Sequence, residues 1–111
     1  MPSSLGAMLE AAILPALDRA HFDMMTAGDP ALQREVAGLF RGQADEWRAA
    51  LSTPEAPGWA DAVHKLKGSA RGIGLVALAD VCEAAEREGG AAASKKVAAA
   101  LEKALAALAA Y

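Results

Sequence analysis

The chain has 111 residues, a formal net charge of −3 and hydrophobic residues at 54% of its positions, with aromatic residues at only 5%. This length suits a single domain over residues 1–111 with a modest core, and it is too short for two domains. A composition rich in alanine and poor in aromatic residues favours closely packed helices over a sheet. The acidic balance argues against nucleic-acid binding, which needs a basic face to neutralise phosphates.

Three features of the sequence bear on the compartment. Cys82 is the only cysteine, so an internal disulfide is impossible and a reducing compartment is expected. The N-terminal stretch lacks a basic region and Glu10 interrupts its apolar residues, which is untypical of a signal peptide. No run approaches the roughly 20 apolar residues that span a bilayer. We therefore expect a soluble cytoplasmic domain that binds neither membrane nor nucleic acid.

The first half of the chain predicts two helices. Apolar residues recur at spacings of three and four over residues 4–20, where Pro15 is expected to bend or split the helix. After a break at Ala27-Gly28, Asp29 can cap a second helix and Pro30 can occupy its first turn. The apolar face expected for this second helix consists of Leu32, Val36, Leu39, Phe40, Trp47 and Leu51.

Three more helices are predicted after the loop over residues 53–58. The third runs over about 58–72, and Gly72 and Gly74 mark its end. The fourth carries the stripe Leu75, Leu78, Val81, Cys82 and Ala85 and stops at Gly89-Gly90, and the last runs over about 92–109. Loops this short join antiparallel neighbours. The predicted fold is all-α, an up-and-down antiparallel four-helix bundle with an additional N-terminal helix.

The segment from Val63 to Gly74, VHKLKGSARGIG, concentrates glycines, cations and a histidine. A dinucleotide fingerprint needs GxGxxG after a strand, and a phosphate-binding P-loop needs GxxxxGK[ST] between a strand and a helix. The glycines here run GxxxGxG, and no strand pattern precedes them. A phosphate-binding glycine loop is therefore rejected on spacing and on context.

On a helix the same segment separates into two faces. Trp59, Val63, Leu66, Ala70 and Ile73 fall on one side, whereas His64, Lys67, Gly68 and Arg71 lie opposite. Glycine inside a helix costs about 1 kcal/mol relative to alanine, so Gly68 suggests that something must approach the histidine closely.

The chemistry available to this face is a covalent anionic adduct on His64. Imidazole Nε2 is a good nucleophile near neutral pH, and the Lys67 ammonium, one turn away, can bind phosphoryl oxygens. An acceptor for the other ring nitrogen would hold the tautomer that leaves Nε2 free. Glu86, at the edge of the inward stripe of the fourth helix, is a plausible acceptor.

These residues resemble a known pattern. His64-Lys65-Leu66-Lys67-Gly68-Ser69-Ala70, followed by Gly74-Leu75, Leu78 and Cys82-Glu83, is similar to the HxLKGSS...GxxxLxxxCExxE pattern of histidine phosphotransfer (HPt) domains of two-component signalling. The similarity is strongest over residues 57–89, and residues 29–40 resemble the preceding helix of the family. Arg71 and Gly72 stand where the family varies.

The resemblance implies a role for each matching residue. His64 would accept a phosphoryl group at Nε2 from a receiver-domain aspartyl phosphate and pass it to another receiver aspartate. Lys67 would stabilise the phosphoryl oxygens, Gly68 would leave room for the receiver, and Glu86 would bond the other ring nitrogen. The chain would be a phosphocarrier and not an enzyme, without a nucleotide site or cofactor of its own. Its partners would be response-regulator receivers or a hybrid histidine kinase, and the receiver would supply Mg²⁺.

Two alternatives stay open at this point. The histidine could be phosphorylated directly by an ATP-dependent kinase, or the domain could be a helical adaptor in which His64 is passive. Apolar surface near His64 is expected to bind the partner. The N-terminal helix, through Leu9, Ile13, Phe22 or Met24, is the candidate to supply it.

The remaining polar residues of interest have ordinary explanations. Lys65 and Arg71 are expected to be solvated charges, although Arg71 shares the face of His64, and Ser69 to bond back to a helix carbonyl. Cys82 is expected to pack in the core, and His21 to be structural or incidental. The two histidines and the cysteine lack zinc-ligand spacing, so no metal site is expected.

Overall fold

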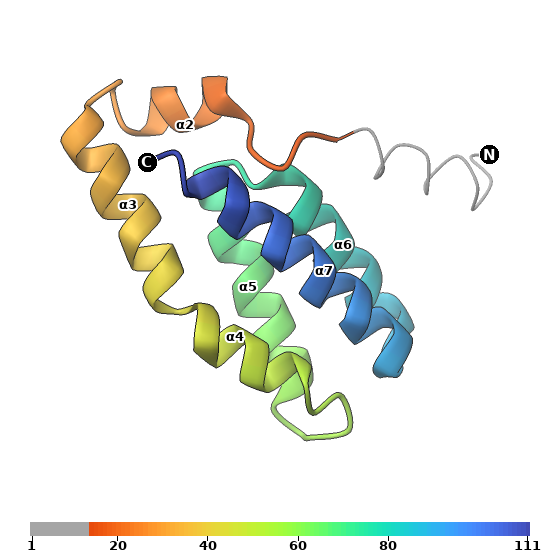
Figure 1. The fold of residues 1–111 in the computed structure, drawn as a ribbon. Coiled ribbons are helices and arrows are strands. Elements are labelled where there is room, and N and C mark those ends of the chain that lie inside the picture. Colours follow the sequence, from red (N-terminus) through yellow and green to blue (C-terminus); the bar gives the residue numbers. More distant parts are fainter. Residues whose placement is uncertain (1–13) are drawn as a thin grey trace, which may run out of the picture.

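Six helices and no strand make up residues 14–111, the part of the chain that the computed structural model describes (Figure 1). The helices are α2 (Arg19–Met25), α3 (Pro30–Gly42), α4 (Ala44–Leu51), α5 (Trp59–Ile73), α6 (Val76–Glu88) and α7 (Gly90–Leu108). The predicted all-α class is therefore confirmed. No helix in this part of the chain is both long enough and apolar enough to cross a membrane.

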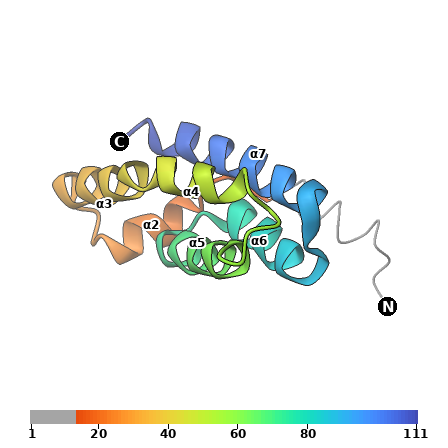
Figure 2. The same ribbon diagram turned by 90° about the horizontal axis from the view of Figure 1, so that it is seen from below.

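Helices α5, α6 and α7 lie antiparallel to their neighbours, and α3 and α4 follow one another along the open side of α5 (Figure 1). Viewed from below, α4 and α7 form one layer and α5 and α6 the other (Figure 2). Together these elements make the four-helix bundle, and α2 crosses one of its ends (Figure 1). The largest fully buried apolar side chains fill the space between them: Phe22, Leu66, Leu75, Leu78, Leu101, Leu108, Val63 and Val97.

The second predicted helix begins where its capping signals place it, but it is broken and rotated. The Asp29 carboxylate accepts a hydrogen bond from Ala31 N at 2.9 Å, and Pro30 is the first helical residue. The helix is interrupted at Gln43, which separates α3 from α4. Leu39, which we expected to face the core, keeps 67% of its surface exposed.

The inward line of α3 instead passes through Gln33, Ala37 and Phe40. Gln33 is buried because its amide donates to Asp23 Oδ1 at 2.8 Å and to Thr26 Oγ1 at 3.1 Å. Buried polar groups are tolerated where such partners satisfy them. With Gln33 facing inward, α3 is rotated about its axis relative to the prediction. Leu32 and Leu39, which were predicted to lie on the buried face, therefore point partly outward.

The helix predicted over residues 4–20 is wrong where the structure describes it, and residues 4–13 lie outside the described part. Residues 14–18 are not helical, and α2 begins only at Arg19. The Asp18 carboxylate fixes this start by accepting a hydrogen bond from His21 N at 3.1 Å. Pro15 lacks the backbone N–H that a continuous helix would use at that position.

Gly74 alone ends α5, whereas Gly72 lies within the helix, which corrects the shared role predicted for the two glycines. Gly74 has a φ of 90°, and Leu75 N donates to Ala70 O at 2.8 Å, as in a Schellman cap. The N-terminal segment docks on this turn, because Asp18 N donates to Gly74 O at 2.7 Å. His21 Nε2 donates to the Gly72 carbonyl at 3.1 Å, so His21 has a structural contact.

Candidate functional site on helix α5

His64 lies on the solvent side of α5, as the periodicity predicts. The opposite side of the helix is buried through Trp59, Val63, Leu66 and Ala70. The His64 side chain keeps 70% of its accessible surface. One turn further along, Gly68 is exposed, and a Cβ added there would meet no atom within 4 Å. The imidazole therefore stands on an open surface that a second protein can reach.

The Glu86 carboxylate joins the two functional side chains of α5 from the neighbouring helix α6. Its Oε1 lies 3.2 Å from His64 Nδ1, and its Oε2 accepts from Lys67 Nζ at 2.9 Å. A carboxylate can only accept hydrogen bonds, so Nδ1 carries the proton in this contact. In the neutral ring the lone pair of Nε2 is then free and directed away from Glu86.

The two contacts stabilise the ionised form of Glu86. The hydrogen bond from Lys67, followed by that from His64, lowers the pKa of the Glu86 carboxyl below its ordinary value, although partial burial opposes the shift. The Lys67 side chain keeps only 13% of its accessible surface, so its methylene stem packs against the bundle while its ammonium reaches the carboxylate. The site thus holds a fixed cation and a fixed anion beside the imidazole.

The other charges near His64 are paired with carboxylates on the surface. Lys65 Nζ lies 3.0 Å from Asp61 Oδ2 one turn earlier, and Arg71 Nη2 lies 3.1 Å from Glu83 Oε2 on α6. Both pairs are largely open to solvent and contribute little to stability. Lys65 and Arg71 therefore remain ordinary surface charges in this structure.

Cys82 faces the interior of α6, as its place on the apolar stripe predicts. Its side chain is fully buried, and that burial raises the pKa of the Cys82 thiol to about 12. A thiol in this state is neither a nucleophile nor a metal ligand at neutral pH. Among residues 14–111, no group of three or more His, Cys, Asp or Glu side chains could hold a metal ion.

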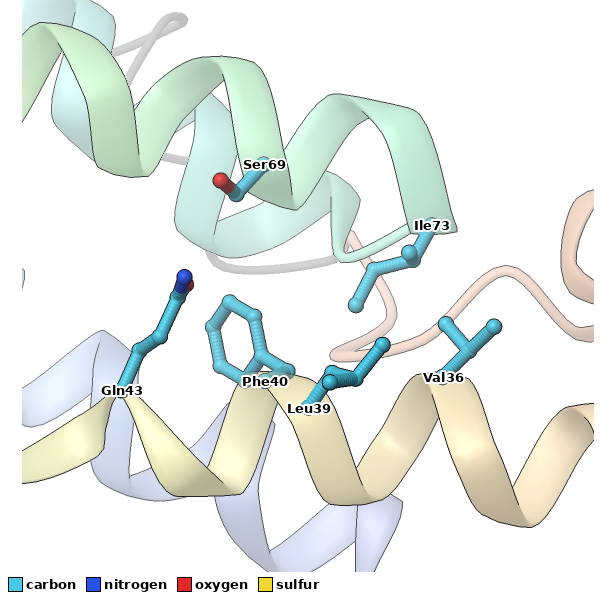
Figure 3. Close-up of a pocket in the computed structure, with 6 residues that line it drawn as sticks. All are labelled: Val36, Leu39, Phe40, Gln43, Ser69 and Ile73. Carbon is cyan, nitrogen blue, oxygen red and sulfur yellow. The ribbon is translucent and has the colours of Figure 1, made fainter.

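A shallow apolar hollow between α3 and α5 is a feature that the sequence did not reveal, and it lies around α5 from the His64 face (Figure 3). Its volume is about 230 Å³, and its lining residues are Val36, Leu39, Phe40, Gln43, Ser69 and Ile73. Ser69 therefore belongs to the wall of a surface groove. The hollow exists because of the way α3 is rotated about its axis. The spacing of apolar residues predicted a different rotation, so nothing in the sequence indicated the hollow.

The N-terminal residues predicted for partner binding divide in the structure. Phe22 is completely buried and is therefore unavailable to a partner, whereas Met24 keeps 73% of its surface exposed. Leu9 and Ile13 lie outside the described residues. Phe22 packs edge to face on Tyr111 with ring centroids 4.9 Å apart, which explains why α2 buries this aromatic side chain.

The fold and the site together define a small helical bundle that displays one histidine with a free Nε2 beside a lysine. Comparison with known proteins agrees with that class. Residues 30–111 match the family model described as the Hpt domain. The chain therefore belongs to the Hpt domain family, and its general function is histidine phosphotransfer in two-component signalling.

A solved structure supports the same conclusion. The crystal structure of the histidine phosphotransferase ShpA from Caulobacter crescentus superposes with a TM-score of 0.77 and 45% sequence identity. The match covers 86% of this chain and 89% of that chain. A search of the curated proteins found no match.

Proposed function

We propose that this chain is a phosphorelay intermediate, in which His64 accepts a phosphoryl group from the aspartyl phosphate of one receiver domain and passes it to the aspartate of another. The observation that carries the proposal is the Glu86 carboxylate shared between His64 Nδ1 and Lys67 Nζ, at 3.2 and 2.9 Å. This arrangement leaves Nε2 as the nucleophile and places a cation one helical turn away.

In the forward step the lone pair of His64 Nε2 attacks phosphorus. An N–P bond forms, the P–O bond to the receiver aspartate breaks, and the aspartate leaves as a carboxylate. No proton has to move, because Nδ1 keeps its hydrogen and the phosphorylated ring carries the positive charge. Glu86 Oε1 is placed to stabilise that charge, and the reverse step returns neutral imidazole as the leaving group.

Lys67 is proposed to change partners during the reaction. In the free protein its ammonium is bound to Glu86 Oε2. A phosphoryl group on Nε2 brings about two negative charges to the same face, which attract the ammonium more strongly than the shared carboxylate does. Lys67 would then bind phosphoryl oxygens, and Glu86 would be left with the positively charged ring. Each charge would thus keep an opposite neighbour.

The chemistry on this chain needs no nucleotide and no metal of its own. We propose that Mg²⁺ is supplied by the receiver domain, which carries the acyl phosphate. Direct phosphorylation of His64 by an ATP-dependent kinase and a passive adaptor role are the competing functions, and both are separable from the relay by experiment.

The experiment is incubation of the protein with phosphorylated receiver domains of the same organism. We expect a label on the wild-type chain that is lost in acid and survives base, as a phosphohistidine is. His64→Gln should abolish the label, and His21→Gln should retain it, because His21 is the other histidine of the chain and its ring is bonded to the Gly72 carbonyl. Labelling by a histidine kinase with ATP, without any receiver, would favour the kinase-fed alternative. No label from either source would contradict the relay.

A further inference from the structure

Arg71 extends the line of basic residues on α5 beyond Lys67. Residues 64, 67 and 71 are spaced by three and four, so they share one face of the helix. Two carboxylates of α6 oppose the two cations. Lys67 Nζ donates to Glu86 Oε2 at 2.9 Å, which we call the inner pair. Arg71 Nη2 lies 3.1 Å from Glu83 Oε2, which we call the outer pair.

The two pairs differ in their exposure to solvent. In the inner pair, the Lys67 and Glu86 side chains are mostly covered by the bundle. In the outer pair, the Arg71 and Glu83 side chains keep 51% and 43% of their accessible surfaces. Solvent screens the outer pair more strongly, so its ion pair is the easier of the two to exchange.

Glu83 and Glu86 are near neighbours on α6. They are three residues apart, and side chains at this spacing have Cβ atoms about 5–6 Å apart on a helix surface. The Arg71 guanidinium has five N–H donors, and its contact with Glu83 is made through one nitrogen, Nη2. A change of side-chain rotamer therefore brings this guanidinium to the Glu86 carboxylate without moving either helix.

The thiol beneath these pairs confirms that Arg71 and Glu86 are close. Burial is the main reason that the pKa of the Cys82 thiol rises to about 12. The Glu86 carboxylate adds to this rise, whereas the Lys67 and Arg71 cations oppose it. Arg71 and Glu86 therefore act on the same buried sulfur, although they belong to different pairs.

Phosphorylation of His64 disturbs the charge balance of the two pairs. In the free protein, two cations face two carboxylates. A phosphoryl group brings about two negative charges, while the phosphorylated ring carries one positive charge. In the proposed reaction Lys67 then leaves Glu86 for phosphoryl oxygens. One carboxylate oxygen of Glu86 loses its partner, and Arg71 is the remaining cation of the two pairs.

We propose that Arg71 is a positioning residue that exchanges partners after Lys67 does, leaving Glu83 and binding the vacated oxygen of Glu86. This inference rests on the proposed function, because it requires Lys67 to move to the phosphoryl group. Once Arg71 occupies Glu86, Lys67 cannot return to that oxygen and stays on the phosphoryl group. Arg71 touches no reacting atom, so it stabilises the phosphorylated state from about 10 Å along α5.

The experiment compares urea unfolding of the free chain with that of the chain labelled by phosphoramidate, a small phosphoryl donor. In the labelling step His64 Nε2 attacks phosphorus, the P–N bond of phosphoramidate breaks and ammonia leaves. Double-mutant cycles that combine Arg71→Gln with Glu83→Gln or with Glu86→Gln measure the coupling of Arg71 to each carboxylate. We expect coupling to Glu83 alone in the free chain and to Glu86 alone in the labelled chain. Each coupling should change the unfolding equilibrium constant by about threefold, as expected for a partly exposed ion pair.

Lys65 provides the matched control, because it is also an exposed cation of α5 but pairs with Asp61 one turn earlier. Lys65→Gln should show no coupling to Glu86 in either state. NMR of the Arg71 guanidinium protons in the wild-type chain gives a second measurement that needs no variant. These signals should shift when His64 is labelled.

The proposal is overturned if Arg71 stays coupled to Glu83 after labelling, or if it is never coupled to Glu86. The same coupling for Lys65, or guanidinium signals that labelling leaves unchanged, would overturn it as well. Failure of the relay itself gives a different result, since phosphoramidate would still label His64 while no receiver would label the wild-type chain. A wild-type chain that phosphoramidate does not label either would contradict both.

Discussion

Replacing Glu86 by glutamine tests how one side chain serves both functional residues of α5. The carboxylate accepts from His64 Nδ1 through one oxygen and from Lys67 Nζ through the other. Glutamine has the same shape but only one acceptor oxygen, so it cannot satisfy both donors. If its oxygen faces Lys67, its amide N–H₂ faces Nδ1 and favours the tautomer that carries the proton on Nε2. If its oxygen faces His64, Lys67 loses its partner.

The size of the effect follows from the exposure of the two contacts. A hydrogen bond between charged groups is worth about 1.5–3 kcal/mol when well shielded. Here the Lys67 and Glu86 side chains keep 13% and 25% of their accessible surfaces, so solvent screens part of that energy. We expect Glu86→Gln to lower the free energy of unfolding by about 1 kcal/mol, and to slow phosphoramidate labelling of His64 by about fivefold, the factor that corresponds to such an energy.

The assay combines labelling rates with nitrogen NMR of the His64 ring, which distinguishes the two tautomers. Glu83→Gln is the matched control, because Glu83 lies one turn earlier on α6 and pairs with Arg71 instead. The reasoning is refuted if Glu86→Gln keeps both the wild-type tautomer and the wild-type labelling rate, or if Glu83→Gln reproduces its effect.

The same variant carries a prediction about pH. The folded-state pKa of Glu86 lies below its ordinary value of 4.5, mainly because of the Lys67 hydrogen bond. The carboxylate therefore contributes its full stabilisation above the unfolded-state pKa and loses it as the pH falls through the folded-state pKa. The difference in unfolding free energy between the wild-type protein and Glu86→Gln should thus shrink in acid. A difference that stays constant from pH 7 to pH 3 would contradict this linkage.

Three further predictions concern the framework of the site. Gly74→Ala should destabilise the protein by about 2 kcal/mol in urea unfolding, because φ at this residue is 90° and the new Cβ would lie 3.0 Å from the Asp18 carbonyl oxygen; an unchanged midpoint would be inconsistent with that geometry. Ser94→Ala should cost about 2 kcal/mol, since the buried hydroxyl accepts from Trp59 Nε1 at 2.9 Å and its loss leaves that donor unpaired; near-neutral behaviour would indicate that the indole finds another acceptor. Cys82 should resist alkylation by iodoacetamide at pH 8 in the folded protein and react after unfolding, because its side chain is completely buried and that burial raises the pKa of the thiol; rapid native-state alkylation would show that α6 opens.

Helix α3 shows where reading the sequence was sufficient and where it failed. Its start was predictable, because the cap at Asp29 and the proline at Pro30 act on the nearest backbone groups. Its buried face was predicted wrongly at Leu39 and missed at Gln33. The amide of Gln33 is buried only because α2 supplies Asp23 and Thr26 as partners, and no pattern within α3 contains that information.

The N-terminal region shows a related limit. Apolar residues at helical spacing predicted one helix across Pro15, yet α2 starts at Arg19. The docking of Asp18 on the Gly74 carbonyl holds the chain in a non-helical path immediately before this start. That contact joins residues far apart in the sequence, so local periodicity could not anticipate it.

The sequence by itself determined the register of α5. Helical geometry fixes which side chains share a face, so the spacing of Val63, Leu66 and Ala70 was enough to turn His64 and Lys67 outward. The sequence made a contact between Glu86 and His64 plausible. The packing of α6 on α5 decided that one carboxylate oxygen of Glu86 binds His64 and the other binds Lys67. The hollow between α3 and α5 was likewise decided by the rotation of α3. Residues on one helix are related by a fixed period, whereas residues on two helices meet only at a distance and rotation that the whole core sets.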